Sequence, residues 1–122
     1  KMPDSEWYEK FNARQHQSFI GEWYSWVNDP MYHLFWNFHS KAPTNATGYS
    51  NPEVDRLIDE GLYETDLAKR EQMSKQAQKI IVEEAPWAIL YQINYTIAVR
   101  KNIKGFNWYP DVGTRFWKVS KV

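Results

Sequence analysis

The sequence predicts an α/β fold in which helices flank a mixed sheet, and three observations lead to this prediction. Apolar residues recur at helical spacing over residues 51–62 and again over 66–84. Segments rich in β-branched and aromatic residues, typical of strands, occupy 18–26 and 88–99. Because these strands and helices follow one another in mixed order, we expect one layered domain or a piece of one.

The amino-terminal end is predicted to form a short helix over residues 4–13. Asp4 or Ser5 would cap its first turn, since either side chain can accept a hydrogen bond from a free backbone N–H group. Trp7 and Phe11 are four residues apart, so both should lie on the buried face of this helix.

The strand over 18–26 is predicted to end where a second helix begins. Asp29 followed by Pro30 is a good helix start, because proline at the first helical position costs no hydrogen bond. We therefore expect a helix from Pro30 to about Phe38, followed by a polar loop over 41–48.

Two possible starts compete for the third helix. Ser50 and Glu53 match a capping box, whereas Asn51 could cap a helix whose first residue is Pro52. The sequence leaves both open. The apolar stripe of this helix consists of Val54, Leu57, Ile58 and Leu62.

The longest predicted helix begins after Thr65 or Asp66 and runs to about Glu84, where Pro86 stops it. Arg70 and the neighbouring lysines are expected to project into solvent. Its apolar stripe consists of Leu67, Met73, Ala77, Ile80 and Ile81. The rest of the chain should form the buried strand 88–99, turns at 104–105 and 110–113, and a last strand at 116–119.

Composition excludes several classes of function. The chain has 15 Lys and Arg against 15 Asp and Glu, so it lacks the basic field that attracts nucleic acid. It has no cysteine, which excludes disulfides and thiol chemistry, and no apolar run approaches the roughly 18 residues of a membrane-spanning helix. The sequence opens on Lys1 without a signal-peptide pattern, which fits either a cytoplasmic chain or a piece whose signal was removed.

Side chains that could carry catalysis or bind a metal are few and poorly arranged. His33 and His39 are six residues apart, off one helical face, so no metal or other cofactor is expected. Asp55 and Asp59 are expected to point into water near Arg56, without a cleft that would shift their pKa values. Neither a Gly-rich phosphate loop nor a GxSxG motif occurs, so we do not expect an enzyme.

The most unusual feature is the aromatic content, 17% with 7 Trp and 8 Tyr. Trp23, Tyr24 and Trp26 lie within four residues and are followed by Asn28 and Asp29. On an extended segment Tyr24 and Trp26 would share one face while Trp23 points to the other. Flat rings beside polar groups suit either a core or a site for a sugar ring or another flat-faced solute.

Six short motifs carry a resemblance to a known family. They are Trp23-x4-Asn28-Asp29-Pro30, Gly48-Tyr49-Ser50-Asn51-Pro52-Glu53-Val54-Asp55-Arg56-Leu57-Ile58, Asp66-x3-Arg70, Gln76-Ala77-Gln78-Lys79-Ile80, Glu84-Ala85-Pro86 and Ala98-Val99-Arg100-x4-Gly105-Phe106. In that order and spacing they resemble the carboxy-terminal part of the family 5 extracellular solute-binding proteins. These are the oligopeptide- and dipeptide-type binding components of ABC importers.

The resemblance implies a fragment of a two-lobed periplasmic-binding-protein fold, type II and cluster C-like. Residues 1–90 would form the carboxy-terminal portion of one lobe, and 91–122 would cross the hinge and pack on the other lobe. The implied partners are a solute, the remaining part of the same binding protein and the membrane subunits of an ABC permease, and no nucleic acid. The implied location is periplasmic or extracellular, associated with the cell surface.

The resemblance also bears on the solute. In peptide-binding members an aspartate at the position matching Trp26 pairs with the peptide's amino group, and an indole cannot replace that carboxylate in kind. A sugar ring has no charge to neutralise, so we expect a β-linked oligosaccharide, such as a cello- or manno-oligosaccharide, with an oligopeptide as the alternative. The expected ligand-binding residues are Trp23, Tyr24, Trp26, Asn28, Tyr49, Tyr91 and Asn94.

Two alternatives from other classes stay open. A small glycoside hydrolase would need two carboxylates facing each other about 5–10 Å apart in a cleft. A free-standing carbohydrate-binding module fits poorly with helices at 51–62 and 66–84, because such modules are mostly β-sandwiches.

Overall fold

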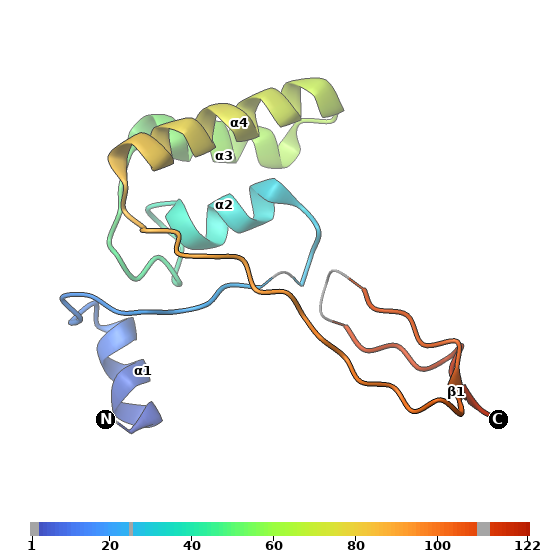
Figure 1. The fold of residues 1–122 in the computed structure, drawn as a ribbon. Helices are drawn as coiled ribbons and strands as arrows, with labels where there is room; N and C mark the ends of the chain where they lie inside the picture. The colour runs from blue at the N-terminus through green and yellow to red at the C-terminus, as the bar shows by residue number, and fades with distance from the viewer. Residues whose placement is uncertain (1–2, 25, 110–112) are drawn as a thin grey trace. The chain divides into compact units, whose positions relative to one another are not determined.

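The computed structural model describes three stretches of the chain, residues 3–24, 26–109 and 113–122. The described residues form two compact units. Unit 1 comprises the residues up to Gly21 together with Asp29–Ala88, and unit 2 comprises Glu22–Asn28 and Ile89–Val122. Unit 1 contains helices, whereas unit 2 contains a small sheet (Figure 1).

Three helices of unit 1 pack around one apolar core (Figure 1). They are α2 (Pro30–Phe38), α3 (Pro52–Tyr63) and α4 (Leu67–Glu84), and each contacts the other two. The buried core consists of Met31, Leu34, Val54, Leu57, Ile58, Ala77 and Ile81. All three helices were predicted from the sequence, and the bounds of α2 agree at both ends.

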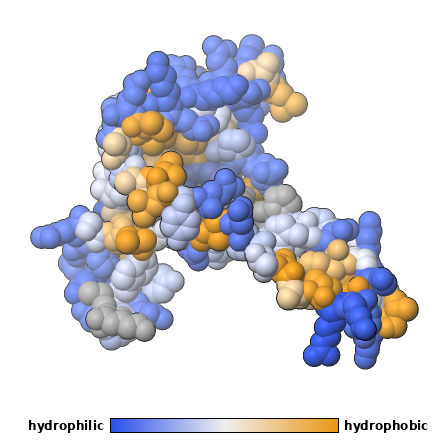
Figure 2. All heavy atoms as spheres, in the orientation of Figure 1, coloured by the Kyte–Doolittle hydropathy of each residue, from blue (hydrophilic) through white to orange (hydrophobic). Residues whose placement is uncertain are grey.

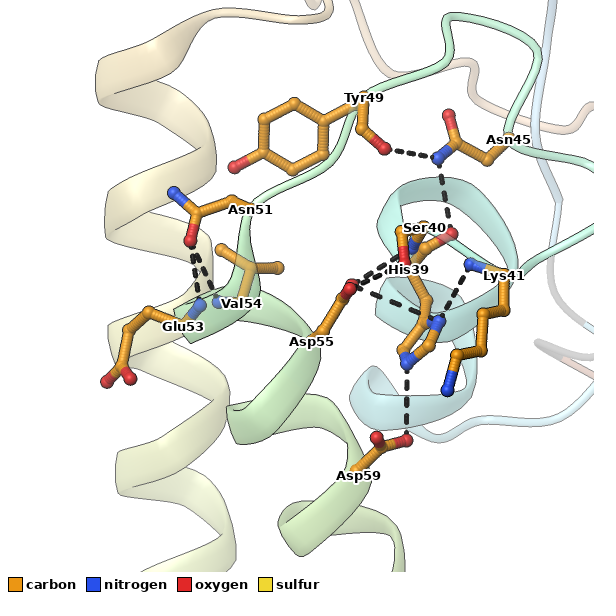
Figure 3. Close-up of polar contacts among 10 residues, drawn as sticks. All are labelled: His39, Ser40, Lys41, Asn45, Tyr49, Asn51, Glu53, Val54, Asp55 and Asp59. Carbon is orange, nitrogen blue, oxygen red and sulfur yellow. Dashed lines mark hydrogen bonds and ion pairs between the residues drawn. The ribbon is translucent and has the colours of Figure 1, made fainter.

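The starts of these helices follow from local side-chain chemistry. Asp29 accepts the Met31 N–H at 2.9 Å and caps α2. Asn51 Oδ1 accepts two N–H groups of the first turn of α3, at 2.9 and 3.2 Å (Figure 3). The Asn51 alternative is therefore correct and the capping box of Ser50 is wrong. Asp66, and not Thr65, caps α4.

The predicted apolar stripes are only partly buried. Val54, Leu57 and Ile58 lie in the core as expected, but Leu62 is partly exposed and Gly61 is buried in its place against Met31. On α4, Ala77 and Ile81 are buried while Leu67 is 79% exposed, which makes that assignment wrong. Leu67 is the first residue of α4 and does not belong to the buried core cluster of the described residues.

The amino-terminal helix α1 (Asp4–Asn12) is held by aromatic contacts. Its cap residue is Pro3 and no side chain caps it, so the prediction of Asp4 or Ser5 as the cap is wrong. Trp7 and Phe11 do share one face, with ring centroids 4.9 Å apart, although neither is fully buried. Both rings also meet Phe19 edge-on.

The predicted mixed sheet does not form among the described residues. Neither 18–26 nor 88–99 contains a strand there, and the last strand lies beyond 116–119. One antiparallel pair is present, β1 (Ile103–Lys104) with β2 (Ser120–Lys121). A strand needs a neighbour for its N–H and C=O groups, and the described chain supplies none for the two long segments. The regular secondary structure of the described residues is therefore mostly helical.

Candidate functional site

The aromatic segment, residues 22–28 in unit 2, carries most of the predicted binding side chains. Trp23, Tyr24, Trp26 and Asn28 are all exposed, and Trp26 keeps 68% of its surface accessible. The rings of Tyr24 and Trp26 are adjacent, with centroids 6.2 Å apart and planes at 51°. These rings are not part of a core formed by the described chain, so they are available to another molecule or to another part of a longer protein.

Further exposed apolar surface of unit 2 follows the segment predicted as a buried strand (Figure 2). Its exposed apolar side chains are Ile89, Leu90, Tyr91, Ile93, Tyr95, Ile97 and Val99. From Tyr91 to Ile97 they alternate with polar residues, so a paired strand here would bury one face and leave the other polar. Tyr91 and Asn94 would then point to opposite faces, and only one of them could meet a given solute.

Tyr49 lies in unit 1, apart in sequence and in unit from the other predicted site residues. Its hydroxyl donates to Glu84 Oε2 at 2.5 Å, and its ring meets Phe38 edge-on. Burial, together with the hydrogen bond to the Glu84 carboxylate, raises the pKa of Tyr49. The side chain thus joins the loop before α3 to the end of α4, and its role in binding stays a prediction.

An arginine that the sequence analysis placed in solvent connects the ends of three helices. Arg70 donates from a terminal nitrogen to Asp29 Oδ2 at 2.6 Å and from Nε to the Gly61 carbonyl at 2.8 Å. The side chains of Arg70 and Asp29 are only 23% and 25% exposed. The expectation that Arg70 projects outward is wrong. The sequence did indicate that Arg70 faces inward, because Arg70 lies three and seven residues before Met73 and Ala77, on the core-facing side of the helix.

The ion pair sets the charge of Asp29. Burial opposes its ionisation, but the hydrogen bonds from Arg70 and from the Met31 N–H outweigh burial and lower the pKa of Asp29. Asp29 therefore stays a carboxylate to a lower pH than a free aspartate does. One of its oxygens caps α2 and the other holds Arg70.

Asp55 of α3 does not point into water, as the sequence analysis expected, but toward the connection that follows α2, whereas the side chain of Asp59 is 59% exposed (Figure 3). Asp55 accepts from the backbone N–H and the hydroxyl of Ser40, at 2.9 and 2.5 Å. His39 is 2% exposed; its Nδ1 accepts the Lys41 N–H at 3.1 Å, and its Nε2 lies 3.2 Å from Asp59 Oδ1. Asp55 thus holds this loop in place through Ser40, whereas Asp59 lies beside His39 Nε2 without a hydrogen bond to it.

A cavity of about 370 Å³ opens beside the Asp29–Arg70 pair. Its volume is within the range of small-molecule sites. Charges of both signs line it, and none of the predicted binding residues does. The lining consists of Asp29, Pro30, Met31, Leu67, Arg70, Glu71, Ser74, Lys75 and Gln78.

Metal and membrane features were also sought in the part of the chain that the structure describes. There, no group of three or more His, Cys, Asp and Glu side chains is arranged to hold a metal ion. No helix in those residues is both long and apolar enough to cross a membrane.

Comparison with known proteins gives several relatives that are named as binding proteins. The chain is 38% identical over 94 residues to the probable D,D-dipeptide-binding periplasmic protein DdpA of Escherichia coli (strain K12), a match over 75% of this chain and 18% of that protein. It is 31% identical over 108 residues to the oligopeptide-binding protein OppA of Bacillus subtilis (strain 168), 86% of this chain and 20% of that protein. The glutathione-binding protein GsiB of Escherichia coli (strain K12) is 38% identical over 59% of this chain and 14% of its own length.

These matches support a segment of a solute-binding protein. The chain spans only about a fifth of the length of the first two relatives, 18% and 20%. No protein-family model matches the sequence, and no solved structure matches the fold. All three relatives are named for binding peptides or a peptide-like molecule, and none for binding a sugar, so the leading oligosaccharide expectation has no support from them.

Proposed function

We propose that this chain is a segment of a peptide-binding protein that delivers its solute to an ABC permease. The observation that carries the proposal is the similarity to a D,D-dipeptide-binding and an oligopeptide-binding protein over 75% and 86% of this chain. Relatives named as binding proteins also favour capture of a solute over hydrolysis. The protein would act in the periplasm or at the cell surface.

The aromatic segment 22–28 is proposed as the part of this chain that meets the peptide. The exposed rings of Tyr24 and Trp26 can pack against apolar side chains, and Asn28 can hydrogen-bond to the peptide backbone. Trp26 stands where the resemblance implies an aspartate for the amino group. Cation–π attraction between the ammonium and the indole would compensate in part, by about 0.5–2 kcal/mol.

Oligosaccharide binding is the second candidate. The observation that favours it is the pair of exposed neighbouring rings without a charge at residue 26, which suits stacking on a β-linked sugar. The sequence analysis ranked oligosaccharide binding above peptide binding. We rank peptide binding first, because the named relatives are named for binding peptides. The sugar proposal rests on the aromatic segment alone.

The proposed mechanism is closure of two lobes around the solute. A solute stabilises the closed state when its contacts there are better than in the open state. Residues 1–90 are proposed to belong to one lobe, and 91–122 to the hinge crossing and the other lobe. Tyr91 and Asn94 would then lie near the hinge, and Tyr49 would support the first lobe.

Calorimetric titration of the natural polypeptide that contains this chain tests the proposal, with trialanine and cellotriose as probes. Peptide capture predicts saturable binding of trialanine, and Trp26→Asp should bind it at least as tightly because the carboxylate gives the ammonium a partner. The control is Trp117→Asp, which places the same charge at another exposed tryptophan and should leave affinity unchanged. Binding of cellotriose alone, lost in Trp26→Asp, would replace the peptide proposal with the sugar one.

A further inference from the structure

Residues 91–97 of unit 2 present two rows of side chains with different chemistry. On an extended chain, residues two apart lie on the same side, so odd-numbered and even-numbered positions form separate rows. The apolar row consists of Tyr91, Ile93, Tyr95 and Ile97, and the polar row of Gln92, Asn94 and Thr96. In the structure these residues form neither a helix nor a strand, and all of them are exposed (Figure 1). Such alternation is typical of a strand with one face on a core and the other face polar.

The apolar row is incompletely covered within unit 2. Its side chains keep between 41% and 75% of their surface exposed. The ring of Tyr95 does meet Trp108 of the same unit, with centroids 5.1 Å apart and planes at 31°. The row is therefore already a packing surface, although both of these rings stay exposed. Covering the rest of the row would be favourable, because apolar surface in contact with water costs free energy.

The surroundings of the two rows indicate that the apolar one is permanently covered. No Asp, Glu, Lys, Arg or His occurs in residues 85–99. Strands whose edges face solvent usually carry charges that keep other chains from pairing with them, and this segment has none. A cover that is always present comes from the same polypeptide, whereas a second copy or a transient partner would leave the row in water part of the time. The chain spans only 18% and 20% of two relatives, so proteins of that length have ample further chain to supply the cover.

We propose that the apolar row docks as a strand against the remaining part of the same polypeptide, and that the polar row, with Asn94 at its centre, faces the solute. This inference rests on the proposed function. Amide and hydroxyl side chains hydrogen-bond to uncharged groups, so the polar row suits the amide groups of a peptide backbone. Tyr91 belongs to the apolar row and would then pack inside the protein, on the side away from the solute.

Cysteine labelling of the natural polypeptide that contains this chain tests the docked row. Ile93→Cys and Ile97→Cys report on the apolar row, and Gln92→Cys and Thr96→Cys report on the polar row. Each variant is labelled with N-ethylmaleimide without solute, and mass spectrometry reads the tryptic peptide that ends at Arg100. Dividing each rate by the rate of the same variant unfolded in urea removes differences in thiol reactivity.

The expected result is an alternation of labelling rates along the segment. Both apolar-row variants should label about tenfold more slowly than both polar-row variants, because labelling of a docked residue waits for local opening. Lys75→Cys, at a side chain that is 73% exposed, gives the fast limit, and Ala77→Cys, at a buried residue, gives the slow limit. Equal rates in the two rows, or slower labelling of the polar row, would overturn the docking.

Affinity for trialanine, measured by calorimetry, tests the polar row. Asn94→Ala should weaken binding about two- to tenfold, the change expected for loss of one hydrogen bond. The control Tyr95→Phe keeps the ring that meets Trp108 and should bind like the wild type. Wild-type affinity in Asn94→Ala would overturn the role of the polar row. If the wild-type polypeptide binds no trialanine, the proposed function fails and the role of Asn94 with it, while alternating labelling would still support the docked row.

Discussion

Gly61 of α3 lies against the Met31 side chain of α2, and the effect of replacing this glycine should depend on the residue at position 31. A Cβ atom built on Gly61 would lie 2.3 Å from Cε and 2.9 Å from Sδ of Met31. Met31 is 1% exposed and also lines the cavity beside Arg70, so the end of its side chain can shift only by changing its contacts there. Gly61→Ala therefore requires the α2–α3 contact to change.

The expected magnitude follows from two opposing terms. Overpacking a core costs about 1–3 kcal/mol, and the flexible thioether of methionine should keep the cost in the lower part of that range. Alanine in place of glycine inside a helix contributes about 1 kcal/mol in the other direction. We therefore expect Gly61→Ala to destabilise the helical unit by about 0–1 kcal/mol.

A second variant, Met31→Ala, removes the side chain that a Cβ atom at Gly61 would meet. Met31→Ala by itself should cost about 2–5 kcal/mol through the cavity that it leaves. Gly61→Ala added to Met31→Ala has nothing to displace, so it should stabilise by about 1 kcal/mol. Amide hydrogen exchange of buried α3 residues such as Ile58 measures the opening free energy of this unit directly. Equal stabilisation by Gly61→Ala in both backgrounds would refute the clash between Gly61 and Met31.

Three further predictions follow from single contacts. Asn51→Ala should destabilise α3 by about 1 kcal/mol, measured by urea unfolding, whereas Asn51→Ser should lose less because serine still caps. Gly105→Ala should disrupt the β1–β2 pair, seen as faster amide exchange, because φ is +75° and the added Cβ would lie 1.9 Å from the Lys118 carbonyl. The lowered pKa of Asp29 contributes stability that is fully present above its unfolded value of 3.8 and is lost as pH falls through the folded pKa. Unfolding midpoints measured between neutral pH and pH 2 should therefore fall less steeply in Asp29→Asn than in the wild type.

The helices of unit 1 could be predicted because their determinants are local. Asp29 with Pro30 and Asn51 with Pro52 supply both a side-chain acceptor and a first residue that needs no hydrogen bond. The choice between Ser50 and Asn51 as the cap was decided by backbone geometry, which places Asn51 in the extended conformation of a cap residue. Local sequence signals therefore located α3 but did not identify its cap residue.

The candidate site was harder to predict than the helices. The aromatic segment stood out by composition, and its described rings are exposed in the structure, while their role in binding stays a prediction. The Asp29–Arg70 contact joins residues far apart in the sequence, and sequence reasoning placed Arg70 in solvent although its spacing on the helix agreed with the buried stripe. A charged residue on a core-facing stripe indicates a buried partner of opposite charge. Asp29, the acidic cap of α2, is that partner for Arg70.

The sequence by itself determined the helical elements, the absence of thiol chemistry and the density of aromatic rings before Asp29, because these depend on residue type and on neighbours in the chain. Only the tertiary structure decided that Arg70 joins three helix ends, that Asp55 and Asp59 face His39 and Ser40, and that 18–26 and 88–99 form no strand among the described residues. The physical reason is the same in each case. Ion pairs and sheet ladders need partners from distant parts of a chain, and a helix completes its hydrogen bonds within itself.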